Sequence, residues 1–139
     1  MEIILFIGIP ASGKSTFYMQ NFYQTHMRIN LDMLRTRKRE DIFIDACIKA
    51  HQSFVVDNTN TTLEARKKYI EIAKQQGISI IGYYFETSLK DAIRRNQGRS
   101  GKQRIPDVAV AAVNKRLTVP SYSEGFDKLY RVKVQEGFT

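Results

Sequence analysis

Continuous apolar runs recur along this chain and predict the strands of a sheet. Residues 3–7 read Ile-Ile-Leu-Phe-Ile, residues 53–57 read Ser-Phe-Val-Val-Asp, and residues 78–85 form a third apolar run. Uninterrupted runs rich in β-branched and aromatic residues are typical of strands that are buried on both faces. A short strand is also predicted over 27–31, and the alternation over 129–134 predicts an edge strand with one exposed face.

The segments between these runs have helical character, and helices are predicted over residues 14–23, 41–50, 62–76, 89–96 and 106–117. Thr61 or Thr62 is the candidate N-cap of the third helix, which is expected to end at Gly77. Ser88 is the candidate N-cap of the fourth. Strands that alternate with helices predict a parallel sheet with helices on both faces. The expected fold class is therefore a three-layer α/β architecture, in one domain that spans 1–139.

The turn after the first strand carries the clearest chemical signal. Residues 8–15 read Gly-Ile-Pro-Ala-Ser-Gly-Lys-Ser, which matches the phosphate-binding loop G-x-x-x-x-G-K-[ST], and Thr16 follows. Glycines let the backbone approach an oxyanion closely, and successive N–H groups at a helix N-terminus bind it. In this motif the lysine reaches the β- and γ-phosphates and the hydroxyl after it binds Mg²⁺. We therefore predict a P-loop NTPase fold that binds ATP and Mg²⁺ through Gly8, Ala11, Ser12, Gly13, Lys14, Ser15 and Thr16.

Two carboxylates are predicted to lie at the same edge of the sheet. Asp57 directly follows the strand at 54–56, as in a Walker B motif, and is predicted to hold the metal with Ser15, directly or through water. Asp32 follows the strand at 27–31 and is predicted to accept the proton of the acceptor hydroxyl. The alternative for Asp32 is a helix N-cap before Met33, and the two roles are compatible.

Basic residues follow in two groups. Arg35 lies three residues after Asp32 and would share its face on a helical turn. A glycine-containing stretch with five basic residues is predicted to be a mobile basic lid around 94–105, which would bring cations to the transferring phosphate and exclude water. The alternative for this stretch is a solvated charged loop. Its basic residues are Arg94, Arg95, Arg99, Lys102 and Arg104.

Composition limits the possible partners and locations. The chain has 22 Lys and Arg against 14 Asp and Glu, a net charge of +8 that favours an anionic partner. The single cysteine, Cys47, cannot form an internal disulfide. The apolar run at 3–9 is too short to span a bilayer and has no basic segment before it, so a cytoplasmic location without membrane contact is expected. The oligomeric state is not predicted.

Beyond the phosphate loop, several stretches resemble the polynucleotide 5′-hydroxyl kinases of phage and of animal kinase-phosphatases. The likeness covers nearly the whole chain. It rests on Ile29-Asn30-Leu31-Asp32 with Arg35, on Val56-Asp57-Asn58-Thr59-Asn60 and on Arg95-Asn96 with Arg99. It continues through Ile105-Pro106-Asp107-Val108 and Ser123-Glu124-Gly125-Phe126.

This resemblance implies an adenylate-kinase-like fold and Mg²⁺-dependent transfer of the ATP γ-phosphate to a 5′-hydroxyl. It implies that Asp32 is the general base and that Arg35 belongs to the acceptor site. Arg99, with Arg95 as a second candidate, would be the lid arginine on the phosphates. Asn60, with Asp57, would lie at a strand end beside the active site and contact the substrate.

Three functions remain open from the sequence. The leading hypothesis is a polynucleotide 5′-hydroxyl kinase with a basic channel to Asp32, formed by Arg35, residues 37–39, and Lys67 or Lys68. Binding through phosphate contacts of that kind should weaken steeply with salt. The second is a kinase of a nucleoside, sugar or other metabolite, with a closed pocket in place of the channel. The third is an ATP-binding module without kinase activity that acts through a partner.

Overall fold

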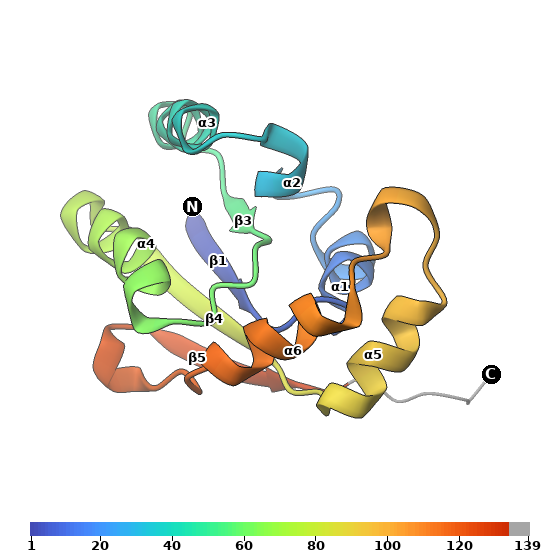
Figure 1. Cartoon of the computed structure of the whole chain (residues 1–139). Helices are drawn as coiled ribbons and strands as arrows, with labels where there is room; N and C mark the ends of the chain where they lie inside the picture. The colour runs from blue at the N-terminus through green and yellow to red at the C-terminus, as the bar shows by residue number, and fades with distance from the viewer. Residues whose placement is uncertain (134–139) are drawn as a thin grey trace.

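The fold is built on five parallel strands. The computed structural model describes residues 1–133, apart from the side chain of Lys102. The strands are β1 (Glu2–Ile7), β2 (Met27–Ile29), β3 (Phe54–Val56), β4 (Ser79–Phe85) and β5 (Lys128–Val132). They form one sheet in the order β2-β3-β1-β4-β5, and every neighbouring pair is parallel (Figure 1). The predicted parallel sheet is confirmed. Val134, the last residue of the predicted edge strand, lies outside the described residues.

Helices connect the strands. They are α1 (Lys14–Asn21), α2 (Leu31–Leu34), α3 (Arg37–Lys49), α4 (Leu63–Gln76), α5 (Leu89–Gln97) and α6 (Asp107–Arg116), with single 3₁₀ turns η1 (Gly101–Gln103) and η2 (Tyr122–Glu124). The predicted caps Thr62 and Ser88 accept hydrogen bonds from the third backbone N–H of α4 and α5. Gly77 ends α4 with φ of 66°. No helix within residues 1–133 is both long enough and apolar enough to cross a membrane.

Two differences from the predicted helices concern the region after β2. The four-residue helix α2 was not predicted, because a helix of this length is too short to show hydrophobic periodicity. The side chain that caps it leaves no periodic signal either. Helix α3 begins at Arg37, four residues before the predicted start, because the Thr36 hydroxyl accepts a hydrogen bond from the backbone N–H of Arg39 at 3.1 Å.

Alternate side chains of the central strand enter two cores. Ile3, Leu5 and Ile7 pack with α3 and α4 on one face of the sheet, while Ile4 and Phe6 pack with α1 on the other. Figure 1 shows α3 and α4 on one side and α1 on the other. Every strand of a parallel sheet ends at the same edge, so the loops after β1, β2 and β3 meet there. This three-layer arrangement is the predicted fold class.

Candidate active site

The loop after β1 leads directly into helix α1 and contains two residues with positive φ. Gly13 is the N-cap of α1 with φ of 96°, and Ala11 has φ of 63°, so both adopt the left-handed region. A Cβ atom on Gly8 would lie 2.7 Å from the Ser12 Oγ and 3.0 Å from the Phe85 Cβ, so only glycine fits this position. The loop is held to the neighbouring segment because the Gly8 N–H donates to the Thr59 carbonyl oxygen at 2.9 Å.

The Lys14 ammonium lies inside this loop. Its Nζ atom donates to the carbonyl oxygens of Gly8 and Ile9 at 3.0 and 2.9 Å, and to the Ser12 Oγ at 3.4 Å. Burial lowers the pKa of Lys14 from 10.5 to about 8.

Three charges around Lys14 act on the same pKa. The negative charge of Asp57 opposes the lowering, the positive charge of Arg99 adds to it, and the negative charge of Asp32 opposes it again. The charges of Asp57, Arg99 and Asp32, three residues predicted at the site, therefore all act on Lys14 from different segments of the chain.

Asp57 and Ser15, the predicted metal ligands, are joined by a residue that was not predicted. The Arg28 side chain donates from Nε to the Asp57 Oδ2 at 2.9 Å, and its Nη2 lies 2.8 Å from the same oxygen. Nη2 also donates to the Ser15 Oγ at 3.1 Å. A hydroxyl and a carboxylate oxygen are the hard donors that Mg²⁺ prefers, so Ser15 and Asp57 fit the ion chemically.

Asp32 lies in the first turn of α2, and the backbone on both sides of it is fixed by asparagine side chains. The Leu31 N–H donates to the Asn58 Oδ1 at 2.9 Å, and the Met33 N–H donates to the Asn30 Oδ1 at 3.0 Å. Asn30 is therefore the N-cap of α2, and the alternative that Asp32 caps this helix is wrong. The Asp32 side chain is exposed at the sheet edge, as an acceptor for a substrate proton must be.

Arg35 does not continue the helical turn of Asp32. Helix α2 ends at Leu34, and Arg35 follows it with φ of 76°, so the predicted shared helical face is wrong. The Arg35 N–H still completes the last helical bond, to the Leu31 carbonyl oxygen at 2.7 Å, but the positive φ of Arg35 turns the chain out of the helix. The Arg35 side chain is exposed, as is that of Asp32.

The buried carboxylate of Glu40 supports the turn that carries Asp32, because it binds Asn58, which in turn binds the Leu31 N–H. Glu40 is fully buried and accepts hydrogen bonds from the Tyr69 hydroxyl at 2.7 Å, the Lys68 Nζ at 3.1 Å and the Asn58 Nδ2 at 3.3 Å. Arg37 also pairs with it at 3.1 Å. Burial by itself raises the pKa of Glu40, but the hydrogen bonds of Tyr69 and Lys68 and the nearby cations hold it below its usual value.

Two residues of the predicted basic channel are paired with other side chains of the protein. Lys68 bonds Glu40 and Asp41, and Arg37 bonds Glu40 and Tyr69, so both cations are engaged within the protein. Lys67 lies 3.8 Å from Glu71 on the exposed face of α4. Arg37 remains exposed despite this pairing, as are the nearby cations Arg35, Lys38 and Arg39.

Asn60 is buried and bonded within the protein. Its side chain donates to the Phe6 carbonyl oxygen at 2.8 Å. The backbone carbonyl oxygen of Asn60 accepts a hydrogen bond from the buried Arg66 at 3.0 Å. Arg66 in turn forms a paired contact with Glu124, at 2.7 and 3.1 Å. This position leaves Asn60 to hold the loop after β3 against β1, in place of the predicted substrate contact.

The predicted lid begins on α5. Arg95 donates to the Ala11 carbonyl oxygen at 3.3 Å, against the phosphate loop, and to the Thr87 hydroxyl at 3.1 Å. Buried Asn96 forms two hydrogen bonds with the backbone of Ile105. Its Nδ2 donates to the Ile105 carbonyl oxygen at 2.5 Å, and its Oδ1 accepts from the Ile105 N–H at 3.0 Å. The residues between them therefore form a loop whose two ends are fixed to each other.

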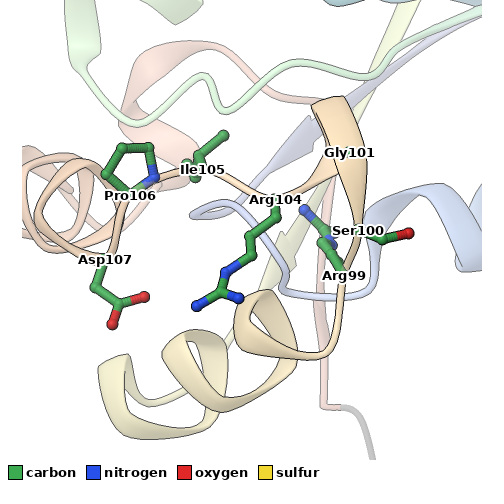
Figure 2. A pocket seen from close by; sticks show the side chains of 7 residues that line it. All are labelled: Arg99, Ser100, Gly101, Arg104, Ile105, Pro106 and Asp107. Carbon is green, nitrogen blue, oxygen red and sulfur yellow. The ribbon is translucent and has the colours of Figure 1, made fainter.

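An open pocket of about 600 Å³ lies beside this loop (Figure 2). Figure 2 shows the Arg104 side chain extending toward α5, with Arg99 on the neighbouring segment. Arg99 donates to the Gln103 carbonyl oxygen at 3.3 Å within the loop. The pocket is lined by Arg99, Ser100, Gly101, Arg104, Ile105, Pro106 and Asp107.

Comparison with known proteins identifies a family and several relatives. A family model described as an AAA domain matches residues 41–120. The chain is 33% identical over 135 residues to a bifunctional polynucleotide phosphatase/kinase of Schizosaccharomyces pombe. The aligned region covers 94% of this chain and 33% of that protein. The chain thus spans about one third of the length of the curated relatives it matches.

Solved structures share the fold at low sequence identity. Kti12 of Chaetomium thermophilum, in complex with ADP-AlF3, superposes with a TM-score of 0.71 at 14% identity, over 97% of this chain and 90% of that one. A gluconokinase from Sinorhizobium meliloti superposes with a TM-score of 0.66 at 18% identity, over 98% and 84%.

Proposed function

The chain belongs to the AAA domain family, and from this premise we propose that it is a kinase that uses ATP and Mg²⁺ to phosphorylate the 5′-hydroxyl of a polynucleotide. The observation that carries the kinase proposal is that the Lys14 ammonium, held by the carbonyl oxygens of Gly8 and Ile9, is acted on by the charges of both Asp57 and Asp32. A phosphate-binding lysine, a metal carboxylate and a second carboxylate for the acceptor are the groups that phosphoryl transfer to a hydroxyl needs.

In the proposed reaction each residue acts on a stated atom. The loop N–H groups and Lys14 bind the β- and γ-phosphates. Ser15 and Asp57 would hold Mg²⁺, which would neutralise charge on the phosphate oxygens. Asp32 accepts the proton of the 5′-hydroxyl as the hydroxyl oxygen forms a bond to the γ-phosphorus. The bond between that phosphorus and the β–γ bridging oxygen breaks, and ADP leaves with the bond's electron pair.

We assign Arg99 and Arg95 to the phosphates, as parts of a lid around 94–105. The charge of Arg99 already acts on Lys14, and Arg95 already contacts the phosphate loop. The mutual bonds of Asn96 and Ile105 support movement of the loop between them as one unit. Cations added over the γ-phosphate would stabilise the charge that develops in transfer.

The polynucleotide acceptor is supported by two observations. The Schizosaccharomyces pombe relative is a polynucleotide phosphatase/kinase, and its similarity covers 94% of this chain. Exposed Arg35, Lys38 and Arg39 follow Asp32 closely in the chain, where the phosphates of a strand entering the site would need cations. A 5′ end would thereby be held by charge, with its hydroxyl at Asp32.

The test is an acceptor panel with labelled ATP and Mg²⁺. It offers one oligonucleotide with a 5′-hydroxyl, the same oligonucleotide with a 5′-phosphate, and a set of nucleosides and sugars. We expect label on the 5′-hydroxyl oligonucleotide alone, with an apparent affinity that falls steeply as salt rises. Label on a small molecule alone would favour a metabolite kinase of the same fold. Release of phosphate without any labelled acceptor would favour a nucleotide-hydrolysing module.

A further inference from the structure

Arg28 lies between the two predicted magnesium ligands. It is the central residue of β2, where it pairs in register with Val55 of β3. Its guanidinium packs 5.9 Å from the centre of the Tyr18 ring, and it bonds the Asp57 Oδ2 through two nitrogen atoms and the Ser15 Oγ through one of them. The phosphate loop, β2 and β3 thus meet at one guanidinium.

The guanidinium and a directly bound ion exclude each other. Mg²⁺ binds oxygen ligands at about 2.1 Å. The Arg28 Nη2 atom lies 2.8 Å from the Asp57 Oδ2 and 3.1 Å from the Ser15 Oγ, and so fills the space between these two oxygens. Both groups are also cations, so they repel each other at such a short separation. One oxygen pair can hold the guanidinium or the ion, but not both.

We infer that Arg28 is a displaceable cation that competes with Mg²⁺ for Ser15 and Asp57, and thereby sets the affinity of the site for the metal. The inference rests on the proposed function, because that function assigns the metal to these two residues. Asp57 is only 3% exposed, and a buried carboxylate needs a charge partner. Arg28 supplies that partner until the ion replaces it.

The pairing of Asp57 with Arg28, before the ion replaces it, also favours the binding of phosphate. An unpaired Asp57 beside the phosphate loop would repel a polyanionic nucleotide, and Arg28 neutralises it. The Arg28 side chain is 29% exposed, so a guanidinium that leaves the carboxylate can remain in contact with water. The Asp57 carboxylate is therefore neutralised by one cation or the other.

The decisive comparison is the affinity of the nucleotide-free protein for Mn²⁺, measured by electron paramagnetic resonance as a probe of the Mg²⁺ position. Arg28→Met keeps the apolar stem of the side chain but removes the competing charge. We expect it to bind Mn²⁺ about tenfold more tightly than the wild-type protein. Arg131→Met, on exposed β5, is the matched control and should bind Mn²⁺ as the wild type does. Adding Asp57→Asn to Arg28→Met should abolish the gain.

Equal Mn²⁺ affinities of Arg28→Met and wild type would overturn the inference. If Arg28→Met does not fold, the wild-type protein decides through the nuclear magnetic resonance signal of the Arg28 Nε–H. That signal should shift when Mg²⁺ and ADP saturate the site, and an unchanged signal at saturation would overturn the inference. A wild-type protein that binds no ADP would instead contradict the proposed function, and the Mn²⁺ comparison would still decide the role of Arg28.

Discussion

The Asn30 side-chain amide donates to the backbone carbonyl oxygen of Asp57 at 2.6 Å, while its oxygen caps helix α2. One side chain thus connects the strand end that carries the predicted metal ligand to the turn that carries Asp32. Asn30→Ala should lower the free energy of unfolding by about 2 kcal/mol, because a helix cap and a buried hydrogen bond are lost together. It should also lower kcat by more than it changes the Kd for ADP, since Asp32 loses its position.

Thr62→Ala provides the control for Asn30→Ala. Thr62 caps α4 through the backbone N–H of Ala65 at 3.1 Å, outside the Asp32 turn. Its loss should cost about 1 kcal/mol in chemical denaturation and leave kcat unchanged. A parallel fall of kcat in both variants would mean that lost stability alone explains the effect of Asn30→Ala.

Nucleotide binding should take up protons near pH 8. The pKa of Lys14 in the free protein is about 8, so about half of the molecules carry a neutral Lys14 at that pH. Phosphates favour the ammonium and raise this pKa, so ADP binding at pH 8 should take up about half a proton, falling to about a tenth at pH 7. Titration calorimetry in buffers of different ionisation enthalpy measures this number. Equal uptake at the two pH values would contradict it.

Glu40→Gln should destabilise the protein in a pH-dependent way. The pKa of Glu40 is held below 4.5 by its hydrogen bonds and neighbouring cations, so its ionised form stabilises the fold above the unfolded-state pKa. The variant should lose about 2 kcal/mol at neutral pH, and the difference should shrink as the pH falls through the folded pKa. Urea unfolding at several pH values measures it. Asp41→Asn, which changes the exposed partner of Lys68, should show little loss.

Arg99→Ala should lower kcat at least a hundredfold with a smaller change in the Kd for ADP, because a lid cation acts on the transferring phosphate. Steady-state kinetics with a 5′-hydroxyl oligonucleotide, alongside ADP titration, separates the two effects. Arg116→Ala, at the exposed end of α6, should match the wild type. A loss of ADP affinity as large as the loss of kcat would place Arg99 in ground-state nucleotide binding.

The sequence predicted well those features that depend on neighbours in the chain. The strands, the capped helix ends at Thr62 and Ser88 and the phosphate loop each follow from a local pattern. Asp32 and Asp57 were also predicted at one edge, because parallel strands all end on the same side.

The residues that were missed depend on contacts between distant segments. Arg28 meets Asp57 because β2 lies beside β3, and strand order is not visible in periodicity. Buried Glu40 reads as one charge within a charged stretch, and only folding brings Tyr69 to it. The Asn60 side chain resembled a substrate ligand by its motif, but it bonds Phe6 on the neighbouring strand. Asn58 was also missed as a residue that supports the Asp32 turn. The signal in the sequence that could have identified it is the pair of asparagines in the segment 57–60.

The central claim is that Asp32 takes the proton of a 5′-hydroxyl while the phosphate loop holds ATP. The direct measurement is γ-phosphate transfer from labelled ATP to a 5′-hydroxyl oligonucleotide by wild-type protein and by Asp32→Asn, with the Kd for Mg²⁺–ADP determined for both. We expect transfer by the wild type, and a hundredfold or greater loss in Asp32→Asn with the Kd unchanged. Undiminished transfer by Asp32→Asn, or no transfer by a wild-type protein that binds the nucleotide, would contradict the claim.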